Sequence, residues 1–329
     1  MLCNVAMVRV RTGSRLHFGL LNLPSNEIGE ASTATPAARY FGGVGMMVTA
    51  PGVSLTSEKA SVWSAEGPNA ERALSFAQRL AEALPRAGIP PQHLTIEACA
   101  PEHKGLGTGT QLGLAVARAV TMCGDLGQLT PVELARLIGR GSRSALGIHG
   151  FCHGGLLVEA GKRGPQAISP LVANLPVPET WRVVLIQPPY EQGLHGAAER
   201  DAFAALGRSG VMSETDMGLS RIVLLRLLPA LAEEDLNEFG EALHEFNLRV
   251  GLMFAPAQGG PYSQPRSQEI IAFVRGEGVR GAGQSSWGPT LFAFVADQER
   301  AVALAGRIQS RFALPCLITS PFNTGAAAG

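Results

Sequence analysis

The stretch Pro101-Glu102-His103-Lys104-Gly105-Leu106-Gly107-Thr108-Gly109-Thr110-Gln111 lies between a predicted strand, residues 94–99, and a helix-compatible segment, residues 112–122. Three near-alternate glycines let the backbone turn its N–H groups inward, and the following helix adds unpaired N–H groups and its positive dipole end. This arrangement suits a phosphate or diphosphate. It is neither a Walker loop nor a Rossmann fingerprint. A tight turn into a packed helix would explain the same residues. The choice between this turn and a phosphate-binding loop therefore depends on other segments of the chain.

The composition indicates which kinds of binding partner and which cellular compartment to expect. The 329 residues allow two domains, and the formal net charge of zero favours neither a nucleic acid nor an acidic membrane surface. Five scattered cysteines without a Cys-x-x-Cys pair predict reduced thiols, as in a cytoplasmic protein. No signal-peptide pattern or bilayer-length apolar run is evident, so we expect no membrane association.

Secondary-structure signals predict an α+β protein with two domains, residues 1–175 and 176–329, joined at a proline-rich passage. The first half is rich in strands, and the second alternates strands with helices. Residues 251–254 are expected to lie between helices, and residues 325–329 to form a frayed tail. The expected helices include residues 71–84, 130–140, 213–231, 233–247, 266–276 and 297–309.

Basic side chains mark two further segments. Arg15 and His17 are two residues apart, so on a strand both face one side, either toward a phosphate or carboxylate or as a solvent-facing stripe. A second glycine-rich stretch, residues 140–155, contains Arg140 and Arg143. Its two histidines and one cysteine match no strong zinc pattern, so we do not expect a metal there.

Three stretches in this order resemble the superfamily of galactokinase, homoserine kinase, mevalonate kinase and phosphomevalonate kinase, the GHMP kinases. They are Ser14-Arg15-Leu16-His17, the loop at residues 101–111, and Gly281-x-Gly283-Gln284-Ser285-Ser286-Trp287-Gly288-Pro289-Thr290. The resemblance implies a two-lobed α+β fold. Its first lobe would be similar to a ribosomal protein domain with a left-handed crossover, and its second lobe would be ferredoxin-like.

Within this superfamily the chain resembles the β-ribofuranosylaminobenzene 5′-phosphate synthases, for which Gln284 and Trp287 around the paired serines are typical. The stretches Arg140-Gly141-x-Arg143-Ser144 and Gly193-Leu194-x-Gly196 with Glu199 add to the resemblance. It implies a condensation of phosphoribosyl diphosphate with para-aminobenzoate or para-hydroxybenzoate that releases carbon dioxide and diphosphate. This reaction is the first committed step of tetrahydromethanopterin biosynthesis. Mg²⁺ as cofactor and a homodimer are also implied.

Two departures weaken an alternative, an ATP-dependent kinase of small molecules. Such kinases usually place an aspartate about eight residues before the closing Gly154-Gly155 pair, near Gly147, where this sequence has no carboxylate. Gly109 also replaces the second serine of the kinase loop. The retained loop glycines and hydroxyls argue against a further alternative, an inactive ligand-binding relative.

The resemblance also assigns roles. Gly105 to Thr110 would cradle the diphosphate, which Lys104 or His103 would neutralise. The arginines would bind the ribose phosphate or the benzoate carboxylate, and Trp287 would stack on the ring or pack in the core. Ser285 and Ser286 would bind substrate or shape a turn, and Glu102 and Glu199 would hold Mg²⁺, bind a ribose hydroxyl or be surface acids.

The predicted site residues form three groups. The catalytic group is Arg15, His17, Arg143, Ser285, Ser286 and Trp287. The group that binds the phosphates is Glu102, His103, Lys104, Gly105, Leu106, Gly107, Thr108, Gly109, Thr110, Gln111, Arg140 and Gln284. The metal group is Thr108, Thr110 and Glu102.

Overall fold

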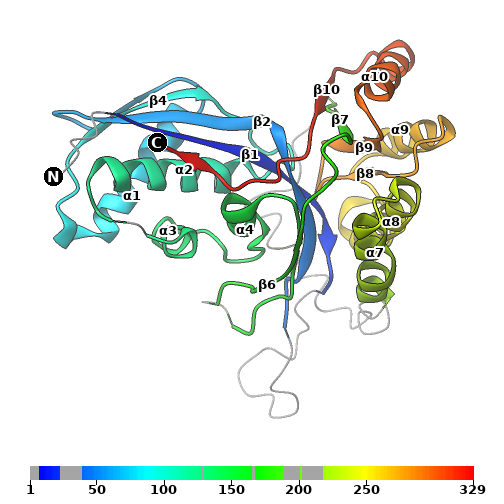
Figure 1. Cartoon of the computed structure of the whole chain (residues 1–329), viewed down its shortest axis with the longest axis horizontal. Coiled ribbons are helices and arrows are strands. Elements are labelled where there is room, and N and C mark those ends of the chain that lie inside the picture. Colours follow the sequence, from blue (N-terminus) through cyan, green and yellow to red (C-terminus); the bar gives the residue numbers. More distant parts are fainter. Residues whose placement is uncertain (1–6, 23–38, 128, 165–166, 189–200, 202–217) are drawn as a thin grey trace.

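The structure is a computed structural model that describes residues 7–22, 39–127, 129–164, 167–188, 201 and 218–329. Two sheets form two lobes. In the described ranges, a seven-stranded sheet lies with four helices in the first lobe, and a four-stranded sheet lies with further helices in the second (Figure 1). The predicted α+β class is therefore confirmed.

The long strand β2 (Gly43–Lys59) organises the first sheet. It pairs with β1 (Met7–Leu20) along most of its length, with β4 (Gln92–Ala98) in its second half and with β5 (Leu156–Glu159) in its first. At its start β1 alternates exposed and buried side chains, as expected of a strand with one face on the core. The remaining strands of this sheet are β3 (Ser64–Glu66), β6 (Leu171–Leu175) and β11 (Ala327–Ala328).

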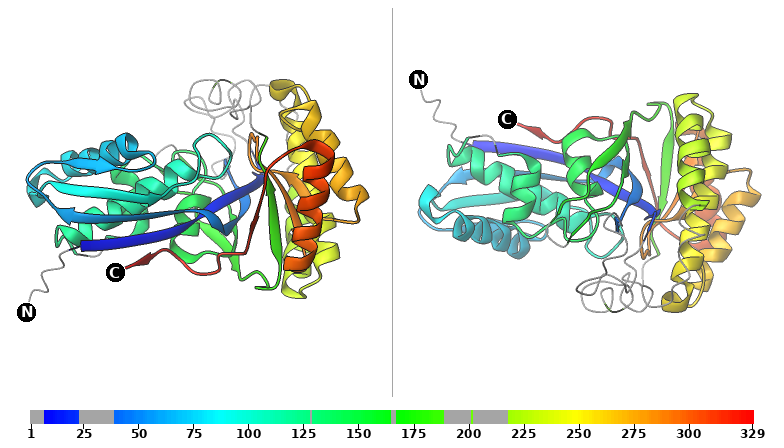
Figure 2. Two further views of the ribbon diagram at one scale, coloured as in Figure 1. Left: turned by 90° about the horizontal axis from the view of Figure 1, so that it is seen from above. Right: turned by 90° about the horizontal axis from the view of Figure 1, so that it is seen from below.

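The described residues of this lobe form four helices, and α2 lies along β1 and β2 (Figures 1 and 2). The helix α3 has Thr130 as its N-cap, and the Thr130 hydroxyl accepts from the Glu133 N–H in a full capping box. The four helices are α1 (Ala70–Ala83), α2 (Thr108–Cys123), α3 (Pro131–Leu137) and α4 (Leu146–His153). A single 3₁₀ turn, η2 (Pro85–Ala87), follows α1.

The second sheet has the strand order β10-β7-β9-β8, and all its pairs are antiparallel. Numbered along the chain this is 4-1-3-2, the ferredoxin-like order that the resemblance implied. Its strands are β7 (Arg182–Ile186), β8 (Ala282–Gln284), β9 (Leu291–Val295) and β10 (Cys316–Thr319). Its helical elements are η3 (Val223–Leu227, a π-turn), α7 (Leu228–Ala232), α8 (Leu236–Gln258), α9 (Pro265–Gly276) and α10 (Gln298–Phe312).

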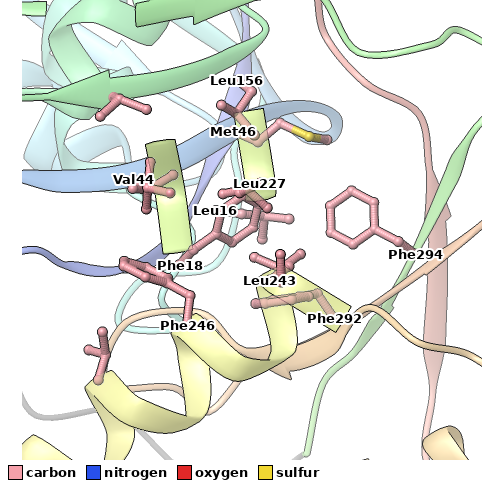
Figure 3. Close-up of a cluster of buried hydrophobic side chains, with 14 of the residues drawn as sticks. Leu16, Phe18, Val44, Met46, Leu156, Leu227, Leu243, Phe246, Phe292 and Phe294 are labelled. Atoms are coloured by element: carbon pink, nitrogen blue, oxygen red, sulfur yellow. The ribbon is translucent and has the colours of Figure 1, made fainter. Parts of the chain in front are cut away.

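One hydrophobic core joins the lobes (Figure 3). Phe18 from β1 lies 5.2 Å from Phe292 and 6.0 Å from Phe294 of β9, between ring centroids. Phe246 of α8 belongs to the same buried cluster. Aromatic pairs at these separations stabilise beyond their burial, so the end of β1 is held firmly between the lobes.

Two expectations about the second half were wrong. Residues 251–254 are helical, because α8 continues to Gln258 and ends at Gly259. Gly251 does not interrupt the helix: a Cβ atom there would lie 2.0 Å from the Pro261 carbonyl oxygen, so glycine permits a close approach. The C-terminus is not frayed, since Ala328 pairs with Val10 along the outer edge of β1.

Two first-lobe helices also differ from expectation. Helix α2 begins at Thr108, four residues before the predicted helical segment 112–122. The helix α4 forms inside the second glycine-rich stretch, where no helix was predicted. Of the helix expected at residues 213–231, the described part from 218 is helical. Within the described residues, no helix is both long and apolar enough to span a bilayer.

Candidate active site

The predicted glycine loop leads directly into α2. Gly105 and Gly107 have φ values of +76° and +69°, the left-handed region that favours glycine, and Gly107 is the N-cap of α2. A Cβ atom on Gly105 would lie 2.4 Å from the Ser285 carbonyl oxygen, and one on Gly107 would lie 2.9 Å from Arg15 Nε. Both glycines are therefore required by conformation and by space.

Ser285 joins the three stretches that carried the family resemblance. Its hydroxyl donates to the Gly105 carbonyl at 2.6 Å and accepts from the His17 N–H at 3.0 Å. In addition, the Ser286 N–H donates to the His17 carbonyl, and the Arg15 N–H donates to the Leu106 carbonyl. Through these hydrogen bonds, the fully buried Ser285 holds the loop against β1. A contact between Ser285 and the substrate stays a prediction.

A cavity of about 190 Å³ lies beside this junction, between the lobes. Its first-lobe end is basic, lined by Arg15, His17, Thr110, Arg140 and Arg143. Its second-lobe end contains the aromatic side chains of Phe254, Tyr262 and Trp287, together with polar side chains that include Gln258 and Gln284. None of the described residues that line the cavity is an aspartate or glutamate.

Arginines concentrate positive charge at the N-terminus of α2. A Cβ atom on Gly109 would lie 2.5 Å from Arg72 Nη2 and 3.3 Å from Arg140 Nη2, so the bare glycine lets both guanidinium groups approach. Burial, followed by the charges of Arg72, Arg79 and Arg143, lowers the pKa of Arg140 to about 10. Like charges held together near a helix N-terminus form a site for a polyanion.

One carboxylate, Glu102, offsets part of this charge. It forms an ion pair with Arg72, and its other oxygen lies 3.7 Å from His103 Nε2. Arg140 instead packs on the Phe76 ring, with its guanidinium carbon 4.9 Å from the ring centroid. Its Nε makes no hydrogen bond to the described part of the chain.

His17 differs from the arginines beside it. Burial, and then the charge of Arg15, lowers the pKa of the imidazole well below its usual value. The ring is therefore neutral at pH 7, and His17 Nδ1 has no hydrogen-bond partner among the described residues. A substrate hydroxyl would therefore suit His17 Nδ1 better than a phosphate or carboxylate group would.

Several predicted residues brace the site. Gln111 donates to the Gly147 carbonyl and accepts from the Thr12 hydroxyl, which ties α2 to α4 and β1. The Thr108 hydroxyl donates to the Pro101 carbonyl and closes the loop. The Gln284 side chain accepts from Ser263 and donates to the Ser286 carbonyl.

Of the predicted loop in the described chain, Thr110 lines the cavity and residues 102–109 do not. The cavity-lining residues of the described chain do not include Lys104, whose Nζ is 3.5 Å from the Pro188 carbonyl oxygen, or His103. Gly193, Leu194, Gly196 and Glu199 lie outside the described residues.

The described residues do not form a magnesium site of their own. No group of three metal-binding His, Cys, Asp or Glu side chains occurs in the described ranges, including residues 149–153. Glu102 is ion-paired, and the Thr108 hydroxyl is engaged with a carbonyl. Mg²⁺ usually takes one or two carboxylates with substrate phosphate oxygens, so the assignment to Thr108, Thr110 and Glu102 stays a prediction.

Glu159, which the sequence did not single out, anchors the arginine-bearing loop. This buried carboxylate accepts from the Ser144 hydroxyl at 2.6 Å and from the Ala145 N–H at 2.8 Å. The Lys162 ammonium donates to the Ser142 carbonyl of the same loop. Burial raises the pKa of Glu159 from 4.5 to about 7, against the smaller effect of these hydrogen bonds.

This shift predicts a pH-dependent stability. The folded state holds the Glu159 proton more tightly, so its contribution is fully present below pH 4.5 and is lost as the pH rises to about 7. The loss amounts to about 3 kcal/mol. Urea unfolding of the wild type and of Glu159→Gln from pH 4.5 to 7.5 measures it. The variant should lack this component, and parallel pH profiles would contradict the assignment.

The fold and the site define the class. A GHMP kinases N terminal domain matches residues 72–155, and a GHMP kinases C terminal domain matches residues 227–314. Mevalonate diphosphate decarboxylase from Staphylococcus aureus superposes with a TM-score of 0.66 at 14% identity, covering 98% of both chains. Homoserine kinase from Cytophaga hutchinsonii gives 0.63 at 16% identity, also covering 98% of both chains. The fold is thus that of the GHMP kinase superfamily.

Curated relatives narrow the family. β-Ribofuranosylphenol 5′-phosphate synthase from Archaeoglobus fulgidus is 31% identical over 308 residues, which cover 87% of each chain. The enzyme of that name from Methanothermobacter thermautotrophicus is 30% identical, covering 89% of this chain and 90% of its own. The chain therefore belongs to the β-ribofuranosylphenol 5′-phosphate synthase family, as its sequence motifs predicted.

Proposed function

We propose that the protein condenses phosphoribosyl diphosphate with a para-substituted benzoate, as a decarboxylating pentosyltransferase. The ring is para-hydroxybenzoate, with para-aminobenzoate as the alternative. The products are a C-riboside 5′-phosphate, carbon dioxide and diphosphate, at the first committed step of tetrahydromethanopterin biosynthesis. The observation that carries the proposal is a single cavity with a basic end and an aromatic end. The phenol in the relatives' name supports the hydroxyl-bearing ring.

The chemistry matches this division. The ring carbon that bears the carboxylate forms a bond to the anomeric carbon, whose bond to the diphosphate oxygen breaks with its electron pair. The bond to the carboxyl carbon then breaks, carbon dioxide leaves, and its electrons restore the aromatic ring. No ring proton is removed, so the reaction does not require the kinase aspartate. That agrees with a cavity in which no described lining residue is acidic.

The basic end suits the leaving group. Arg140 and the N-terminus of α2 would stabilise charge as it develops on the diphosphate, and the bare Gly109 lets the Arg140 guanidinium approach this end of the helix. Mg²⁺, when bound to the diphosphate, would supply further neutralisation. A bidentate arginine on the benzoate carboxylate would oppose decarboxylation, because it would stabilise the charged ground state.

The aromatic end suits the ring. Trp287 stacks on Phe254 with ring centroids 4.6 Å apart and an interplanar angle of 28°. Both residues line the cavity, which supports the assignment of an apolar wall to this end. We propose that the benzoate ring packs against this pair.

Carbon dioxide release tests the function. Carboxyl-labelled para-hydroxybenzoate, phosphoribosyl diphosphate and Mg²⁺ are incubated with the protein, and labelled carbon dioxide is trapped. We expect release that depends on phosphoribosyl diphosphate, with one diphosphate formed per carbon dioxide. Ribose 5-phosphate in its place is the matched control, since it lacks the leaving group. ATP consumption without carbon dioxide would instead indicate a kinase and refute the proposal.

A further inference from the structure

Two cavity-lining side chains at the aromatic end contain polar atoms without partners. The Tyr262 hydroxyl and Gln258 Oε1 are both buried, and neither makes a hydrogen bond to any residue that the structure describes. A buried polar atom left unsatisfied costs about 1–3 kcal/mol. Such atoms in a cavity wall therefore point to a bound group that completes them.

The chemical character of each atom is fixed. Burial raises the pKa of Tyr262 to about 12, so its hydroxyl stays protonated at neutral pH and can donate a hydrogen bond. Gln258 Nε2 already donates to the Gly251 carbonyl at 3.3 Å, which leaves Oε1 as an acceptor. Phe254 and Gln258 are four residues apart on α8, so their side chains lie on the same helix face.

The proposed reaction orients the benzoate ring between the basic and the aromatic end of the cavity. The following inference rests on that proposed reaction. The attacking carbon must face the ribose and hence the diphosphate, which lies at the arginine end. The para substituent is on the opposite side of the ring, so it points toward the other end of the cavity. The second lobe contributes Phe254, Gln258 and Tyr262 to the cavity lining, and the first lobe contributes the arginines.

We propose that Gln258 and Tyr262 bind the para substituent and select a hydroxyl over an amino group. A phenolic hydroxyl donates its one hydrogen to Gln258 Oε1 and accepts from the Tyr262 hydroxyl through an oxygen lone pair. An aromatic amine donates equally well, but its lone pair is delocalised into the ring and accepts poorly. Acceptance of the phenolic hydrogen also raises electron density at the para carbon, which is the attacking atom.

The test compares two substrates and two tyrosine variants. kcat/KM is measured with para-hydroxybenzoate and with para-aminobenzoate for the wild type and Tyr262→Phe. We expect the wild type to prefer the hydroxyl ring, and Tyr262→Phe to reduce that preference about tenfold, the size of one hydrogen bond. Tyr40→Phe is the matched control, since Tyr40 is also buried but does not line the cavity. It should leave the ratio unchanged.

Direct binding separates this inference from the proposed function. Calorimetric Kd values are measured for para-hydroxybenzoate and for unsubstituted benzoate. We expect the wild type to bind the hydroxylated ring more tightly, and Tyr262→Phe to remove most of that difference while its thermal unfolding is unaltered. If turnover is absent but this binding difference holds, the proposed function fails and the inference stands. The inference would be overturned if Tyr262→Phe kept the wild-type preference within twofold, either in the kcat/KM ratio of the two substrates or in the Kd ratio of para-hydroxybenzoate to benzoate.

Discussion

Replacing Arg140 with methionine is expected to lower kcat/KM for phosphoribosyl diphosphate by about a hundredfold without lowering the free energy of unfolding. Loss of one preorganised donor to developing charge typically costs ~3 kcal/mol of transition-state stabilisation. The folded protein gains little from this arginine, because burial and neighbouring arginines lower its pKa to about 10 and so disfavour its charged form. Removing the charge relieves that repulsion, and methionine keeps an apolar contact with Phe76.

Steady-state kinetics at pH 7.5 measure the change in kcat/KM, and urea unfolding at the same pH measures the free energy of unfolding. Arg79→Met is the matched control. Arg79 contributes to the same repulsion but is exposed and does not line the cavity. It should change activity by less than threefold. A stable Arg140→Met variant with near wild-type kcat/KM would place the diphosphate elsewhere, whereas marked destabilisation would show that Arg140 is structural.

Replacing Gly107 with valine is expected to abolish measurable binding of phosphoribosyl diphosphate while the chain still folds. The φ value of +69° disfavours a β-branched residue by about 1–3 kcal/mol. The added Cβ would also lie 2.9 Å from Arg15 Nε and 3.1 Å from Arg15 Cβ. Either the loop, which is proposed to cradle the diphosphate, or Arg15, which lines the cavity beside it, must move.

The control isolates the contact from the backbone strain. Gly88 also has a left-handed φ of +59°, yet a Cβ atom there would meet nothing within 4 Å. Gly88→Val should therefore lose comparable stability and keep wild-type affinity, as measured by calorimetry with phosphoribosyl diphosphate. If folded Gly107→Val binds as tightly as Gly88→Val does, the loop does not cradle the diphosphate.

Local features of this protein were predictable because short-range chemistry decides them. The glycines of the loop need a left-handed backbone, and Thr130-Pro131 with Glu133 begins a helix through its own side chains. The order of three motifs was specific enough to predict both the superfamily and the synthase family. The ferredoxin-like strand order followed from that resemblance and not from periodicity.

The errors had a common cause. The sequence predicts that residues 251–254 lie between helices, but α8 continues through them because the bare face of Gly251 accommodates the Pro261 carbonyl of a neighbouring segment. The C-terminal residues looked frayed, yet the free edge of β1 pairs with them. In each case a contact with another segment outweighed local propensity.

By itself, then, the sequence determined the glycine loop, the cationic residues near it and the family to which the chain belongs. Only the tertiary structure decided how the cavity is divided. Ser285 meets His17 across 268 positions of sequence, and α8 of the second lobe brings Phe254 and Gln258 to the same cavity as Arg140 of the first. Such contacts depend on how two sheets pack around one shared core, which residue spacing along a chain does not encode. The same packing buries Tyr262 and isolates its hydroxyl, a property that no local pattern could have revealed.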